Sequence, residues 1–157
     1  MRSLVVAGMA AALVAVLAQA MPAQAALGGK AASVEADRTR LRATASRAPG
    51  VGFTDTGLSA DGGMTIHEFT ADDGTVFAVA WRGPRRPDLK QLFGAAYFAR
   101  FQADNPPRTG HVYMRRALAS THSDFVVRTG GYSGAQWGYA YLPARIPAGF
   151  DARNLQQ

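Results

Sequence analysis

The sequence predicts an α+β fold, in which an antiparallel sheet of about five to six strands carries an amphipathic helix packed on one face. Three observations predict it. Apolar segments separated by Asp-Gly turns between residues 50 and 82 are typical of a β-meander. A single long segment after residue 88 has helical periodicity, and apolar alternation then returns up to residue 142. The chain has 157 residues and no internal repeat, so one domain is expected.

The first 25 residues have the pattern of a signal peptide. Arg2 gives a short positive start, and the stretch from Leu4 to Leu17 is apolar, uncharged and too short for a membrane span. Small residues at the −3 and −1 positions make cleavage before Ala26 the first expectation. We therefore expect residues 1–25 to be removed. Residues 26–157 would then form a single exported α+β domain, periplasmic or secreted, with no transmembrane segment.

The mature domain is expected to begin with a mobile stretch and a short helix. Residues 26–32 are mostly small, and we expect them to be mobile. Ser33 can cap a helix that runs to about Ala45, because a thin apolar stripe follows it. Pro49-Gly50 would end this segment.

Three strands are predicted next, at about Gly50–Thr56, Met64–Thr70 and Thr75–Arg82. The third has no polar residue from Val76 to Trp81, which is typical of a central strand covered on both faces. Strict alternation predicts two faces for it: Phe77, Val79 and Trp81 on one, and Val76, Ala78 and Ala80 on the other.

The clearest helix of the chain follows a Gly-Pro loop. Asp88 occupies its N-cap position, and Asn105-Pro106-Pro107 ends it. One continuous apolar face is expected, made of Leu89, Leu92, Phe93, Ala96, Tyr97 and Phe101. Because the loop is short, we expect the Trp81 indole to pack on the first turns, near Leu89, Leu92 or Phe93.

Strands are predicted again in the last third, at Val112–Leu118, Asp124–Thr129 and Ala135–Leu142, with a turn at Gly130–Gly134. The final strand places three aromatic residues on one face, Trp137, Tyr139 and Tyr141. The sequence leaves open whether this row is a core face or a sugar-stacking binding face.

Composition is compatible with anionic partners and excludes several chemistries. The chain has 17 basic and 11 acidic residues, and removal of Arg2 with the leader lowers the net charge from +6 to +5. A basic exported protein leans toward anionic partners such as lipid head groups, acidic polysaccharides or nucleic acid. The alternative, which the composition favours, is arginine bias in the genome together with ordinary solubility. The absence of cysteine excludes disulfides, thiolate metal sites and a cysteine nucleophile. No cofactor and no metal site are predicted.

Four cations cluster around the Gly-Pro loop and the start of the long helix: Arg82, Arg85, Arg86 and Lys90. A helix N-terminus favours anions, so these residues form a candidate anion-binding patch. The alternative is an ordinary solvated loop.

No catalytic residue is predicted. His67-Glu68 begins like a zinc-protease motif but lacks the second histidine, and Gly131–Ala135 lacks the final glycine of a nucleophile elbow. A site could still assemble in three dimensions from His67 and Glu68 with Asp124 or Asp88. The sequence therefore leaves enzymatic activity uncertain and favours its absence.

Several segments resemble a family of small exported bacterial proteins that is catalogued only as a domain of unknown function. The resemblance is carried by Gly74–Pro84, by Pro87-Asp88-Leu89 with Leu92-Phe93-Gly94, by Ala26–Gly29 and by Gly138–Pro143. Ile66–Phe69 fits more loosely, since family members tend to have arginine before the glutamate. The resemblance implies export and a single domain, and it implies no activity, cofactor or site residue.

The first functional expectation is therefore a non-catalytic binding or assembly accessory of the cell envelope. Its partner would be an anionic envelope component or another exported protein. The alternatives are a small envelope hydrolase and an arginine-mediated binder of an anionic polymer. The sequence alone does not name the ligand, the partner or the oligomeric state.

Overall fold

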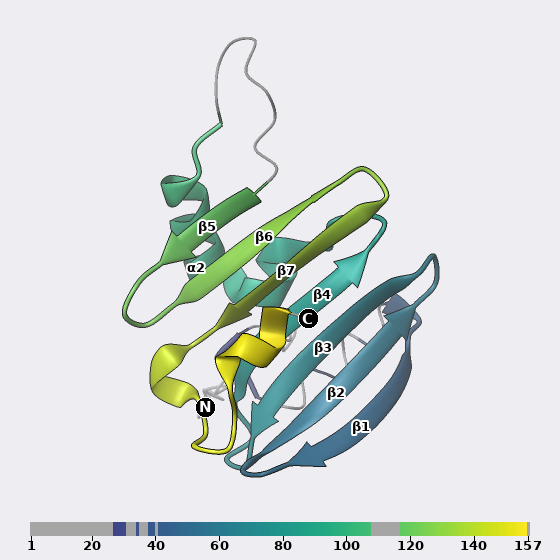
Figure 1. Ribbon diagram of the computed structural model, residues 1–157, viewed down its shortest axis with the longest axis vertical. Coiled ribbons are helices and arrows are strands. Elements are labelled where there is room, and N and C mark those ends of the chain that lie inside the picture. The colour runs from purple at the N-terminus through teal and green to yellow at the C-terminus, as the bar shows by residue number, and fades with distance from the viewer. Residues whose placement is uncertain (1–26, 31–33, 35–37, 40, 108–116, 157) are drawn as a thin grey trace, which may run out of the picture.

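The computed structural model describes residues 27–30, 34, 38, 39, 41–107 and 117–156. Its centre is one antiparallel sheet of seven strands in the order β1-β2-β3-β4-β7-β6-β5 (Figure 1). The strands are β1 Thr44–Gly50, β2 Phe53–Ala60, β3 Met64–Ala71, β4 Val76–Gly83, β5 Ala117–Thr121, β6 Val126–Tyr132 and β7 Ala135–Tyr141. The α+β class and the antiparallel sheet are confirmed. The expected leader and most of the predicted strand at residues 112–118 lie outside the described residues.

Two meanders meet at the centre of the sheet. Strands β1 to β4 form the first, and β5 to β7 form the second, with the helix α2 (Leu89–Asp104) between them in the chain. Among the described residues, the two meanders pair only through β4 and β7. Helix α2 covers one face, which we call the helix face, and the C-terminal segment crosses the other, which we call the tail face (Figure 1).

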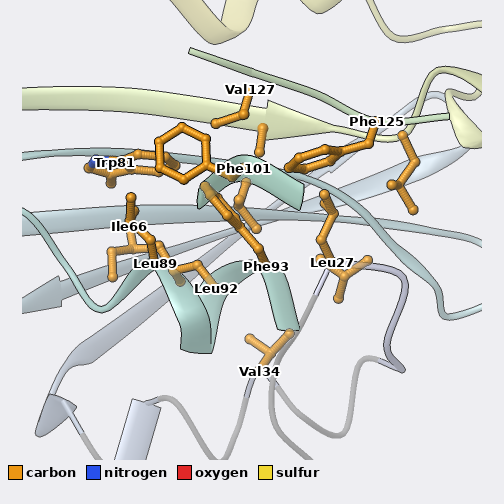
Figure 2. Close-up of a cluster of buried hydrophobic side chains, with 14 of the residues drawn as sticks. Leu27, Val34, Ile66, Trp81, Leu89, Leu92, Phe93, Phe101, Phe125 and Val127 are labelled. Carbon is orange, nitrogen blue, oxygen red and sulfur yellow. The ribbon is translucent and has the colours of Figure 1, made fainter. Parts of the chain in front are cut away.

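The main core lies on the helix face. Phe93 of α2 contacts three aromatic rings, those of Trp81 at 5.8 Å, Phe101 at 5.9 Å and Phe125 at 5.7 Å between centroids (Figure 2). Trp81 is 3% exposed. The expected packing of this indole against the first turns of the long helix is confirmed.

Helix α2 begins and ends as its sequence predicts, but it is not continuous. Asp88 caps it by accepting a hydrogen bond from the backbone N–H of Gln91, and Asn105 follows its last residue. Gly94 interrupts it with φ 77° and ψ 164°, a conformation that is essentially restricted to glycine. The expectation of one unbroken apolar face was therefore wrong, and Ala96, which the pattern placed on that face, is exposed.

Strand β4 is central and covered on both faces, as predicted, but its alternation contains a shift. The register between β3 and β4 slips after Phe69, which pairs with Ala78, because Thr70 pairs with Val76. This bulge turns Phe77 to the same face as Ala78, while Val76 joins the core of the helix face. Strict alternation therefore gave the wrong face for Phe77 and for Val76.

The first strand of the sheet was not predicted. Leu41 is helical, but β1 begins at Thr44, where the sequence favoured a continuing helix, and Pro49-Gly50 lie within it. All seven residues of β1 are exposed, so no buried alternation marks this segment as a strand. Because β1 is at the sheet edge, Pro49 is tolerated there, and pairing with β2 alone defines the strand. The sheet thus has one strand more than the upper bound expected.

Residues 27–30 are tied into the fold, contrary to the expected mobility. Leu27 is 3% exposed, and its backbone N–H donates to the carbonyl of Leu92. Gly28 and Gly29 exchange backbone hydrogen bonds with Val76. The small residues around Leu27 suggested mobility, whereas burial of its side chain between α2 and β4 fixes the segment.

The tail face is covered near its middle by the end of the chain. Two short 3-10 helices follow β7, η1 (Pro143–Arg145) and η2 (Ala152–Gln156). Phe150 and Leu155 pack with Phe77 and Tyr139 in a second core cluster. Among the described residues, no helix is long and apolar enough to cross a membrane.

Candidate functional site

Three side chains from adjacent strands form a polar and aromatic row on the tail face. Thr65 of β3 pairs with Arg82 of β4, and Arg82 pairs with Trp137 of β7. Trp81 points into the core of the helix face, so its neighbour Arg82 emerges on the tail face. Trp137 is 40% exposed, which is unusual for so large an apolar side chain.

These residues line a cavity of about 310 Å³ beside η2. We call it the arginine–tryptophan cavity. The small residues Ala80 and Gly138 also line it, and Gln156 of η2 adds an amide to its wall. No described residue forms a hydrogen bond or ion pair with the Arg82 guanidinium, which leaves this exposed cation available to a ligand. The volume is at the lower end of the range of small-molecule sites.

His67 lies in the wall of the same cavity and is held by a carboxylate. Its Nδ1 lies 2.9 Å from Oδ1 and 3.1 Å from Oδ2 of Asp55, on the neighbouring strand β2. The hydrogen bond with Asp55 raises the pKa of His67 above its usual value, partial burial opposes the shift, and the charge of Asp55 adds to it. Since a carboxylate can only accept, Nδ1 carries the proton in this contact.

A second cavity, of about 440 Å³, lies on the other side of Leu155. We call it the phenylalanine cavity, because Phe53, Phe69 and Phe150 line it. Both cavities are lined by His67, Ala80 and Leu155, so they are neighbours on the tail face. Two carboxylates, those of Asp55 and Asp151, also line the second cavity. Arg153 hydrogen bonds to Asp151 and lowers the pKa of that carboxyl, which is therefore ionised at neutral pH.

Comparison with family models places the chain in a family. The model described as "Protein of unknown function (DUF2844)" matches residues 23–155, which is most of the chain and all of the described fold except Gln156. The chain belongs to DUF2844. This agrees with the resemblance noted from the sequence. No curated protein matches the chain. No solved structure matches it either. The site of this DUF2844 domain must therefore be argued from its own geometry.

The fold of the DUF2844 domain divides the predicted cation cluster. Arg82 lines the arginine–tryptophan cavity on the tail face. Arg85 and Arg86 line a different groove, about 450 Å³ in volume, between the β2–β3 turn and the start of α2. Lys90 is exposed on the first turn of α2 and lines neither. Asp61 and Asp88 line that groove as well, so its charge is mixed.

The aromatic row of β7 is divided between the core of the tail face and the wall of the arginine–tryptophan cavity. Tyr139 is buried in the core cluster of the tail face, and Tyr141 is half-buried beside it. Their rings stack at 6.4 Å between centroids. Trp137, at the end of the row, lines the cavity instead. One part of the row is therefore core, and its outer end borders a cavity.

The expected alternative catalytic set does not assemble. Glu68 is buried on the helix face, opposite to His67, since successive residues of a strand face opposite ways. Asp124 pairs with Arg100 at 2.7 Å, and Asp88 caps α2. His122 pairs with Asp104 at 2.8 Å, and His111 lies outside the described residues. Within the described part of the chain, no group of three His, Cys, Asp or Glu residues could hold a metal ion.

Sequence reasoning missed the role of Asp55. Asp55 lies two residues after Phe53, in a strand whose pairing partner a single sequence does not reveal, so nothing in the sequence connects it with His67. The only available signal was its position: an acidic residue within an otherwise uncharged predicted strand has to face either solvent or a cation.

Proposed function

We propose that this protein is an exported, non-catalytic binding protein of the cell envelope, and that its arginine–tryptophan cavity takes an acidic sugar. One observation supports this above the others. An exposed arginine without an ionic partner among the described residues and a 40% exposed tryptophan are cross-strand neighbours in one cavity. A guanidinium binds a carboxylate, and the flat apolar face of an indole can cover one side of a sugar ring.

The remaining cavity lining suits a ligand rich in hydroxyl groups. Thr65 and Gln156 provide a hydroxyl and an amide, which can both donate and accept hydrogen bonds. His67 adds a third polar edge. A site with few polar groups around an apolar surface is the usual design of a small-molecule pocket.

A binder of a continuous polyanion is supported less well. Such a ligand needs a run of cations along its path, but Arg85 and Arg86 lie apart from Arg82 in a groove that also contains Asp61 and Asp88. The neighbouring phenylalanine cavity is lined by two carboxylates, those of Asp55 and Asp151. The site therefore favours one acidic group at one position over a long anionic chain.

A pure assembly role also has less support. The exposed large apolar side chains among the described residues are Val51, Tyr132 and Trp137. Val51 lies in the β1–β2 turn, away from the β6–β7 hairpin that carries the other two. A protein interface normally has a more contiguous apolar patch.

A matched pair of small ligands tests the proposal. Methyl β-D-glucuronide and methyl β-D-glucoside differ only at C6, which is a carboxylate in the first and a hydroxymethyl group in the second. NMR titration of the mature protein gives both affinities. One partly exposed ion pair is worth about 1 kcal/mol, or roughly fivefold in affinity. We expect the glucuronide to bind tighter by that factor, with the difference shrinking as salt is added. Arg82→Gln should abolish the difference, and Trp137→Ala should weaken both ligands.

Arg86→Gln is the matched control, because Arg86 is equally a surface arginine but lines the other groove. It should leave both affinities unchanged. Equal affinity for the two ligands in the wild-type protein, or no effect of Arg82→Gln, would contradict the proposal. The exported form is tested separately, by mass spectrometry of protein from its native host, which should find a chain that starts at Ala26.

Hydrolysis is a second candidate function, and one observation favours it. His67 is oriented by Asp55 in a cavity wall, which is the arrangement of a histidine that transfers protons during catalysis. Against it, glycoside hydrolysis needs a protonated carboxyl group as general acid, whereas the hydrogen bonds from Arg153 lower the pKa of Asp151 in the second cavity. NMR spectra of oligosaccharides incubated with the protein would show new reducing ends if it hydrolysed them. We expect binding without turnover.

A further inference from the structure

We propose that the phenylalanine cavity is a second subsite of the same ligand, so that the site takes an oligosaccharide in which an acidic sugar is followed by a neutral one. This inference rests on the proposed function, because it needs an acidic sugar beside Arg82. It adds the length of the ligand and the order of its charges.

The two cavities adjoin each other on the tail face. The two cavities are both lined by His67, Ala80 and Leu155, so they lie on either side of one wall. Leu155 belongs to η2, where Asn154 lines the phenylalanine cavity and Gln156 lines the arginine–tryptophan cavity. In Figure 1, η2 crosses the middle of the sheet rather than its edge. A ligand that extends past Leu155 from one cavity therefore enters the other.

The two cavities differ in the charge of their lining. The first cavity offers the Arg82 guanidinium, which pairs with no described residue. The second is lined by the carboxylates of Asp55 and Asp151. Each of them hydrogen bonds to its own partner, Asp55 to His67 and Asp151 to Arg153. A second acidic sugar placed there would lie beside two carboxylates and would be repelled. A neutral sugar can donate its hydroxyl groups to those same oxygens.

The second cavity combines apolar surface with polar atoms. Phe53 and Phe69 are half-buried, and together with Phe150 they present apolar surface beside the polar atoms of Asn154 and the two carboxylates. That combination matches a sugar ring, which has apolar C–H faces and a polar rim. It also matches an N-acetyl group, whose methyl can contact a phenyl ring. At about 440 Å³ the cavity has room for at least one further sugar unit.

The test uses defined oligosaccharides with three charge patterns. Hyaluronan oligosaccharides alternate acidic and neutral sugars, tetragalacturonate is acidic throughout, and chitotetraose with N-acetyl groups is neutral throughout. Calorimetry should find that the hyaluronan tetrasaccharide binds at least tenfold tighter than methyl β-D-glucuronide. It should also bind at least fivefold tighter than either of the other two tetrasaccharides.

Two variants of η2 separate the subsites. Asn154→Ala should weaken the hyaluronan tetrasaccharide severalfold and leave methyl β-D-glucuronide unchanged, because Asn154 lines only the second cavity. Gln156→Ala should weaken both ligands, because Gln156 lines only the first. Asp151→Asn should improve binding of tetragalacturonate relative to hyaluronan, since it removes one of the repelling charges.

The outcomes distinguish this inference from the proposed function. If methyl β-D-glucuronide binds through Arg82 but the hyaluronan tetrasaccharide gains nothing, the second subsite is refuted and the acidic-sugar site stands. If tetragalacturonate binds as well as hyaluronan, the charge order is refuted. If none of the sugars binds, the proposed function fails first.

Discussion

The two tryptophans of the chain occupy neighbouring positions of the β4–β7 pairing but lie on opposite faces of the sheet. Trp81 pairs with Gly138 and is enclosed by the core of the helix face. Trp137 pairs with Arg82 and stands at the edge of a cavity. The same residue type thus has a structural role at one position and a proposed binding role at the next.

Substitution of each tryptophan should separate the two roles. Trp81→Ala removes a buried ring that contacts Phe93, and such a change typically costs about 3–5 kcal/mol. Many small domains have only about 5–15 kcal/mol in total, so this variant should be marginal or unfolded. Trp137→Ala should cost clearly less stability than Trp81→Ala, because Trp137 is 40% exposed and Trp81 only 3%. Denaturant melts of both variants provide the measurement, and an unchanged midpoint for Trp81→Ala would contradict the packing described.

His67 should titrate above its usual pKa because Asp55 stabilises its protonated form. NMR titration of the ring protons should therefore give a pKa above 6.5, and Asp55→Asn should lower it.

The same shift predicts how stability depends on pH. A pKa that is higher in the folded state stabilises the fold fully below the unfolded value of about 6.5, and this stabilisation is lost as pH rises through the folded pKa. Wild type should thus exceed Asp55→Asn in melting temperature most clearly near pH 5.5, and by less at pH 8.5. A gap that widened with rising pH would show that the pair acts in another way. The effect should be small, because both side chains are partly exposed.

At the scale of elements, Gly94 determines the shape of α2. Its φ of 77° and ψ of 164° redirect the helix, so that Phe101 on one side of the break and Phe93 on the other both contact the core. A glycine inside an ordinary helix is replaced by alanine with a gain of about 0.5–1 kcal/mol. Here alanine cannot adopt the native backbone without strain, so Gly94→Ala should destabilise by about 1–3 kcal/mol.

Whether Gly94→Ala lowers or raises stability tests the break in α2. Ala96→Gly, at an exposed position of the second half of α2, should lower the free energy of unfolding by about 0.5–1 kcal/mol, measured by a thermal or denaturant melt. A stabilising Gly94→Ala would mean that α2 is continuous after all and that its apolar residues form a single face.

Helices and strands were predictable wherever one buried face produces a regular spacing of apolar residues in the sequence. The meander, the N-cap at Asp88 and the end of α2 follow from turn residues and apolar spacing, and the structure confirms them. Strand β1 was missed because an exposed edge strand has no buried face to produce alternation. The bulge at Phe77 and the break at Gly94 were missed because periodicity assumes regular backbone, whereas the requirements of packing set these two positions.

At the scale of the whole molecule, the fold class and the packing of a helix on one face of the sheet were predictable. For the candidate site, single residues were predictable, but their positions next to one another were not. Arg82 was selected for charge and Trp137 for its aromatic row, yet each was assigned to a different feature. Strand pairing brings them together, and pairing between segments far apart in the chain leaves no signal in a single sequence. The partnership of Asp55 with His67 is hidden for the same reason.

The pairing of β4 with β7, which joins the two meanders in the described sheet, has a consequence for how this chain folds. Within each meander the paired strands are neighbours in sequence, so each can form quickly through short loops. Pairing β4 with β7 must close a much longer loop across α2, and this costs more chain entropy before any contact repays it. Trp81 lies over Gly138 at this joint, where a Cβ would collide with the indole. We expect the docking of the meanders to be the slow step of folding, with Trp81 fluorescence as its natural reporter.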